Sequence, residues 1–190
     1  MANATRRIMA IDPGLTRCGV AVVDVAANRT VSFVAVETLR TAADTDLPQR
    51  ILELSMGLER FIEQHKPDLI AIERVFSQQN LRTVMGTAQI SGVAMLLAAR
   101  ASIPVQMHTP TEVKAAVTGS GRASKQQVGA MVARLLGLDE IPKPADSADA
   151  LAIAITAGWR SSTVIAVGDQ TPAQLAWQSA EVASKKRTKG

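Results

Sequence analysis

The sequence predicts an α/β fold, in which a mixed sheet is covered by helices. The first forty residues hold three apolar, β-branched runs joined by short links, which is typical of consecutive antiparallel strands. Beyond them, helical apolar periodicity alternates with two further short apolar runs, as in strand–helix units. With 190 residues, of which 47% are hydrophobic, the chain can bury a core of this kind and is not disordered throughout.

The five predicted strands are short apolar runs bounded by turn residues. They are Ile8–Asp12, Cys18–Val25, Thr30–Glu37, Leu69–Glu73 and Ile103–Met107. The first three are separated by links short enough for hairpin connections. The first strand ends in Asp-Pro-Gly, and the fourth also ends in a carboxylate.

Five helices are predicted from apolar spacing and capping residues. The first begins at Thr45 or Asp46, carries Pro48 in its first turn and ends at Pro67. The second, Leu81–Ala101, is dense in small residues. The remaining three are predicted within Thr111–Val117, Ser124–Leu138 and Asp146–Arg160.

The sequence predicts one domain, residues 1–162, followed by a flexible basic tail, residues 163–190. Four basic side chains within residues 185–189 by themselves equal the net charge of +4. The single cysteine excludes an internal disulfide and fits a reducing compartment. No apolar run is long enough to span a bilayer, and residues 1–7 lack the apolar core of a secretory signal. We therefore expect a cytoplasmic protein without a membrane segment.

The charges of the body fall into three zones. Residues 74–138, the basic zone, carry seven Lys and Arg against the single acid Glu112. The flanking residues 1–73 carry 8 basic and 10 acidic groups, and residues 139–184 carry two basic and six acidic groups. The basic zone is either a solvated face or a surface for a polyanion, since phosphate contacts dominate nucleic-acid affinity. Charge alone leaves both interpretations open.

Four carboxylates are candidates for one site. Asp12 and Glu73 end two strands, and ligands of α/β sheets gather at strand ends. Asp146 and Asp149 are three residues apart and share a helix face. Taken singly, Asp12 could shape a turn, Asp146 could cap a helix and Asp149 could favour the helix dipole. Together they predict a cluster neutralised by cations such as Mg²⁺, and two ions about 4 Å apart would support phosphodiester displacement.

Three segments resemble the RuvC family of Holliday junction resolvases. They are IDPGLTRCG (residues 11–19), IERVF (residues 72–76) and DSADALAIA (residues 146–154), in order along a match from about Arg7 to about Trp159. The resemblance implies an RNase H-like fold and a homodimer that resolves four-way DNA junctions in recombination and repair. It implies paired, symmetric, Mg²⁺-dependent cuts that leave 5′-phosphate and 3′-hydroxyl ends. It also implies cooperation with the RuvA–RuvB branch-migration complex.

The resemblance also implies roles for individual residues. The four catalytic and metal-binding positions fall on Asp12, Glu73, Asp146 and Asp149. The DNA contacts fall on Lys114 and Lys125 and on Phe76, which would stack on a base unless it covers the hydrophobic core. We also expect DNA contacts from Arg74 and Arg122, which lie in the basic zone. Two Mg²⁺ ions per site are expected, with Mn²⁺ able to substitute.

Three other functions compete with this interpretation. The first is an RNase H-like nuclease of the YqgF type that acts on structured RNA, which shares the early Asp-x-Gly strand end. The second is an ATPase of the actin-like or sugar-kinase kind, because the segment Asp12–Thr16 resembles the phosphate-binding loop of these proteins. Such ATPases need two lobes, and no second Asp-x-Gly loop occurs in the chain. The third is a junction-binding dimer without activity, against which the presence of all four carboxylates argues.

Overall fold

The computed structural model describes residues 5–74 and 81–161, so the tail predicted over 163–190 lies outside the described residues. The described chain contains a five-stranded sheet in the order β3-β2-β1-β4-β5. Strands β1 to β3 pair antiparallel, whereas β1, β4 and β5 run parallel. The predicted mixed sheet is thereby confirmed. The bounds are β1 Thr5–Asp12, β2 Arg17–Ala26, β3 Val31–Arg40, β4 Leu69–Glu73 and β5 Val105–His108.

Five helices connect and follow the parallel strands. They are α1 Leu47–His65, α2 Leu81–Arg100, α3 Pro110–Thr118, α4 Lys125–Leu136 and α5 Ala145–Ser161. Capping boxes fix the starts of α3 and α4, where Thr109 pairs with Glu112 and Ser124 pairs with Gln127. Helix α4 ends two residues before its predicted end because Gly137 adopts a left-handed conformation, with φ of 64°.

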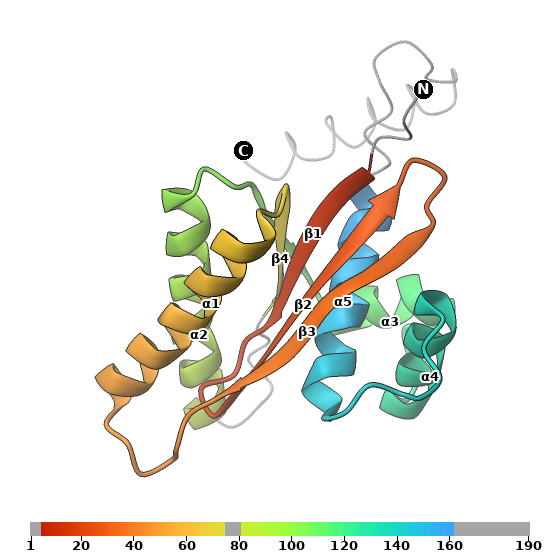
Figure 1. Ribbon diagram of the computed structural model, residues 1–190. Coiled ribbons are helices and arrows are strands. Elements are labelled where there is room, and N and C mark those ends of the chain that lie inside the picture. Colours follow the sequence, from red (N-terminus) through yellow and green to blue (C-terminus); the bar gives the residue numbers. More distant parts are fainter. Residues whose placement is uncertain (1–4, 75–80, 162–190) are drawn as a thin grey trace, which may run out of the picture. The chain divides into compact units, whose positions relative to one another are not determined.

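The helices form a layer on each face of the sheet, α1 and α2 on one and α3, α4 and α5 on the other (Figure 1). Successive side chains of β1 point to opposite faces of the sheet and pack against both helix layers. Ile8 and Ala10 face α5, whereas Met9 and Ile11 face α1 and α2. All four side chains are fully buried. The sheet core is therefore closed on both faces, and its open positions lie at the strand ends.

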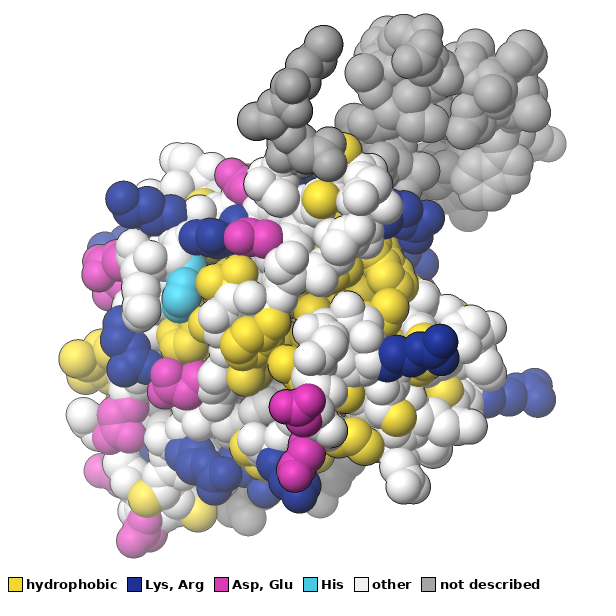
Figure 2. Space-filling view, turned by 45° about the vertical axis from the view of Figure 1, so that its right-hand side comes forward, with side chains coloured by type: hydrophobic (Ala, Val, Ile, Leu, Met, Phe, Trp, Pro, Cys, Tyr) yellow, Lys and Arg dark blue, Asp and Glu magenta, His cyan; other side chains and the backbone are white. Residues whose placement is uncertain are grey.

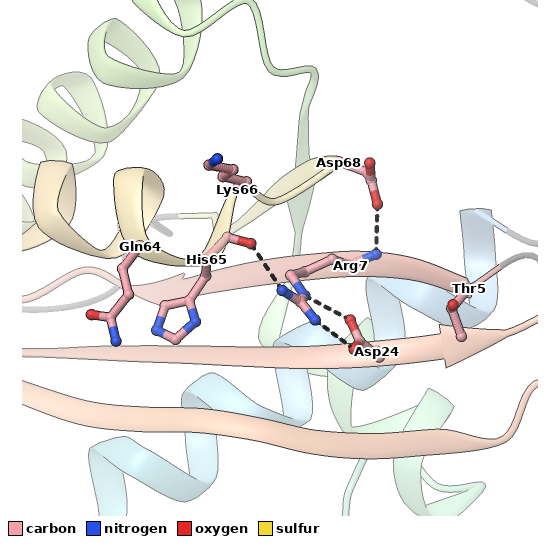
Figure 3. A pocket seen from close by; sticks show the side chains of 7 residues that line it. All are labelled: Thr5, Arg7, Asp24, Gln64, His65, Lys66 and Asp68. Atoms are coloured by element: carbon pink, nitrogen blue, oxygen red, sulfur yellow. Dashed lines mark hydrogen bonds and ion pairs between the residues drawn. The ribbon is translucent and has the colours of Figure 1, made fainter.

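At the end of the sheet where β1 begins, an ion-pair cluster joins β1, β2, α1 and the link before β4 (Figure 3). The Arg7 guanidinium donates to both carboxylate oxygens of Asp24 at 2.8 Å and to the carbonyl of His65 at 3.2 Å. The Arg7 backbone N–H donates to Asp68 at 2.7 Å. These groups line a shallow pocket of about 410 Å³. Since the Arg7 guanidinium is already paired with Asp24, we assign these residues a structural role that holds the strands and α1 together.

Candidate active site

Asp12 and Glu73 meet at the opposite end of the sheet. Strands β1 and β4 are parallel neighbours, with Ile11 opposite Ile72, so their final residues emerge side by side. The side chains of Asp12 and Glu73 lie within hydrogen-bond reach of each other. The two strand ends therefore share one edge of the sheet, as the predicted cluster of carboxylates requires.

Helix α5 brings the second pair of carboxylates to the same edge. Asp146 lies in its first turn, and Asp149 follows three residues later. The close approach of α5 to the sheet depends on Gly19 of β2, which is directly opposite Asp12 in the register. A Cβ atom at Gly19 would overlap the carbonyl oxygen of Asp146 and press on the side chain of Ala150. The glycine thus allows the helix to place Asp146 beside the strand that pairs with β1.

All four carboxylates line one cleft of about 540 Å³. Lys114 of α3 and Lys125 of α4 line the same cleft, as does Arg74 directly after β4. On the face in Figure 2, by contrast, acidic and basic side chains are interspersed rather than gathered by sign. The cleft therefore combines a cluster of acids with a cationic wall, an arrangement suited to bind metal ions together with a phosphate.

Burial and mutual repulsion perturb the acids strongly. Burial, followed by repulsion from Glu73, Asp149 and Asp146, raises the pKa of Asp12 from 3.8 to about 8. The pKa of Glu73 is also raised, first by burial and then by Asp149, although Lys125 and the hydrogen bond from Asp12 oppose the rise. The raised pKa therefore favours the protonated form of Asp12 near neutral pH in the metal-free protein.

Two cations pair with the acids of α5. The Lys125 ammonium donates to Asp149 at 2.7 Å, and this hydrogen bond raises the pKa of Lys125. The Arg17 guanidinium lies 3.2 Å from Asp146. Among the described residues, no three His, Cys, Asp or Glu side chains are arranged closely enough to hold a metal ion. In this arrangement the carboxylates of α5 are directed to basic side chains, and a bound cation would compete with those side chains.

The donor set nevertheless fits a hard divalent cation. Mg²⁺ prefers carboxylate oxygens supplemented by water and substrate phosphate, and four carboxylates line this cleft. Burial is the largest cause of the raised pKa of Asp12, and the second is repulsion from neighbouring carboxylates that the basic side chains leave incompletely balanced. A divalent ion at this position would relieve the repulsion and lower that pKa.

The remaining predicted DNA contacts differ in position. Lys114 and Arg74 line the cleft, and Arg122 is exposed on the loop between α3 and α4 without lining it. Phe76 lies outside the described residues. Sequence reasoning missed Arg17, although it stands within the segment that follows Asp12, and missed Thr87 of α2, which also lines the cleft. A cation five residues after a site carboxylate was a visible signal for Arg17.

Comparisons with known proteins all point to one family. Residues 8–157 match the family model described as crossover junction endodeoxyribonuclease RuvC. A protein of that name from Clavibacter michiganensis subsp. michiganensis is 52% identical over 95% of this chain and 99% of its own length. Another from a Nocardioides strain is 59% identical over 81% of this chain and 87% of its own. The fold also matches the structure of T. thermophilus RuvC in complex with Holliday junction substrate, with a TM-score of 0.79 and 29% sequence identity. The match covers 83% of this chain and 96% of the T. thermophilus chain.

Proposed function

Because the chain belongs to the RuvC family of crossover junction endodeoxyribonucleases, we propose that the cleft of Asp12, Glu73, Asp146 and Asp149 is where it cuts DNA. The protein is a structure-specific nuclease that resolves Holliday junctions in recombination and DNA repair. The observation that carries the site assignment is the presence of all four acids, from three separate elements, in one cleft.

Nucleases of this family depend on a divalent metal, and we propose two Mg²⁺ ions held by the four carboxylates, with Mn²⁺ as a substitute. When bound, the ions supply positive charge to the attacking and leaving oxygens of an in-line phosphodiester displacement. Asp12, between Glu73 and α5, is the proposed shared ligand. Its proton must leave before it can bind a cation, so its raised pKa couples metal binding to pH.

The basic side chains of the cleft are proposed to hold the scissile strand. Lys125 lies at the first position of α4, where the helix dipole disfavours a cation, and its bond to Asp149 offsets this cost. If Asp149 held a cation, the Lys125 ammonium would be available to bind a phosphate oxygen. Lys114 and Arg74 approach from the neighbouring walls, and Arg122 and Phe76 would contact DNA beyond the cleft.

We propose that the protein acts as a homodimer through the outer face of α2. This face is apolar: Met85, Met95 and Leu96 are exposed, as are Ala88, Gly92 and Ala99 between and after them. No charged residue occurs in positions 83–99. Large exposed apolar stripes on one helix are typical of protein interfaces. A two-fold dimer would present two clefts to a two-fold junction and allow paired cuts.

The family assignment also supports two broader proposals. Action together with the RuvA–RuvB branch-migration complex follows from resolving junctions that such a complex moves. A cytoplasmic location follows from a substrate that is chromosomal DNA. Among the described residues, no helix combines the length and apolar character needed to cross a membrane.

A cleavage experiment tests the activity. The purified protein is incubated, with and without Mg²⁺, with a synthetic four-way junction, a linear duplex of the same sequence and a structured RNA. We expect Mg²⁺-dependent, paired cuts in the junction alone. Preferential cutting of the RNA would instead favour a YqgF-type activity.

A further inference from the structure

Arg50 of α1 is a buried charged residue to which the cleavage chemistry assigns no role. Only 9% of its surface is exposed. Within the described residues, no carboxylate lies within ion-pair distance of its guanidinium. Its hydrogen bonds go to two hydroxyl groups, from Nε to Thr41 at 2.9 Å and from Nη2 to Thr16 at 2.8 Å. Burial of a guanidinium without a counter-ion is costly, and an apolar side chain would fill a core position more cheaply.

One of the two hydroxyls, that of Thr16, belongs to a turn that borders the cleft. Thr16 is in the turn between β1 and β2, and Thr41 follows β3. Thr41 also donates its hydroxyl to the carbonyl of Leu15 at 2.6 Å and its backbone N–H to the carbonyl of Thr16 at 3.2 Å. Arg50 therefore lies behind the turn and holds it both directly and through Thr41. In Figure 1 the start of α1 and the connection between β1 and β2 lie at the same end of the sheet.

The turn itself forms part of the cleft wall. It begins directly after Asp12, and its residues Pro13, Gly14 and Arg17 line the cleft. It is also tight, because a Cβ atom at Gly14 would overlap the carbonyl oxygen of Arg17. A shift of this turn would displace the end of β1 and the guanidinium that pairs with Asp146.

We propose that Arg50 is a positioning residue, which fixes the turn Pro13–Arg17 so that Asp12 and Arg17 hold their cleavage geometry. The proposal rests on the proposed function of the cleft, but it concerns a buried residue that does not line the cleft. The bidentate shape of the guanidinium explains why arginine is required. A lysine ammonium keeps the charge but cannot reach both hydroxyls with the same fixed geometry.

The test uses three variants of the full-length protein. Arg50→Lys keeps the charge, Thr16→Val removes one acceptor without changing α1, and Arg60→Met is the matched control. Arg60 lies on the same helix, but it is exposed and pairs with Glu37. Three quantities are measured: junction affinity without Mg²⁺, the single-turnover cleavage rate with Mg²⁺, and hydrogen exchange at the amides of residues 14–17.

For Arg50→Lys and Thr16→Val, we expect cleavage to slow by at least about tenfold while junction affinity changes by less than about threefold. Amide exchange in the turn should rise, whereas Arg60→Met should resemble the wild type in all three measurements. Unchanged turn exchange, or cleavage within about twofold of the wild type, would overturn the proposal. If the wild-type protein fails to cut the junction, the proposed function is wrong, and turn exchange alone decides the role of Arg50.

Discussion

Replacement of Asp12 by asparagine should stabilise the metal-free protein while removing its activity. Burial and three neighbouring carboxylates raise the pKa of Asp12 from 3.8 to about 8. In an unfolded chain this carboxyl ionises near its ordinary pKa, whereas in the folded chain it keeps its proton up to about pH 8. Stability contributed by the protonated form is therefore complete below pH 3.8 and is lost progressively as pH rises toward 8. Asparagine, which does not titrate, escapes this loss.

The magnitude follows from the same pKa values. For each pH unit between 3.8 and neutrality, the folded wild type loses up to about 1.4 kcal/mol of unfolding free energy. The total loss at about pH 7 is therefore at most about 4 kcal/mol. Relaxation around the carboxyl and altered hydrogen bonding to Glu73 reduce the net gain. We expect Asp12→Asn to raise the unfolding free energy by about 1–3 kcal/mol at neutral pH. The gain should shrink toward zero near about pH 4.

Urea denaturation of metal-free wild type and variant across this pH range is the suitable assay. Asp24→Asn provides a control of opposite sign, because Asp24 accepts two hydrogen bonds from Arg7 and its loss should destabilise the fold. If Asp12→Asn is less stable than the wild type at neutral pH, the proposal that burial and repulsion at Asp12 destabilise the metal-free protein is wrong. A gain that does not vary with pH would also contradict it, since the effect would not then come from titration.

Three further predictions concern the metal, the helix position and the dimer. Mg²⁺ affinity measured by calorimetry should increase with pH up to about 8 and then level off, because a proton on Asp12 competes with the cation; a flat profile would exclude that competition. Gly19→Ala should cost about 1–3 kcal/mol in unfolding free energy and slow cleavage, since the new Cβ pushes Asp146 away; an active, fully stable variant would show that α5 tolerates displacement. Leu96→Glu should produce monomers by light scattering, whereas Leu52→Glu, at another exposed leucine on α1, should not; dimers in both would place the interface elsewhere.

Local patterns in the sequence predicted the mixed sheet and marked the four acids as candidates for one site, whereas their catalytic roles came from the family resemblance. A strand that ends in a carboxylate, paired with a parallel neighbour that does the same, leaves little freedom in where Asp12 and Glu73 lie. The three-residue spacing of Asp146 and Asp149 likewise follows from helix geometry alone. These features depend on contacts that the strand and helix periods determine, so the structure agrees with them.

The features that sequence reasoning missed depend on contacts between distant segments. Arg50 and Thr16 are 34 positions apart, and nothing local indicates that this arginine is buried without an acid. The role of Gly19 becomes visible only once α5 is known to pack against β2. His108 lies one residue beyond the predicted strand Ile103–Met107 but is the buried last residue of β5, because Glu73 and His108 pair in register.

The most direct measurement compares junction binding with junction cutting in wild type, Asp12→Asn and Asp24→Asn. Gel-shift assays without Mg²⁺ report binding, and mapping of labelled strands with Mg²⁺ reports the cuts. We predict that all three proteins bind the four-way junction, and that the wild type and Asp24→Asn make paired, symmetric cuts while Asp12→Asn makes none. Cutting by Asp12→Asn at the wild-type rate would contradict the assignment of this cleft as the nuclease site.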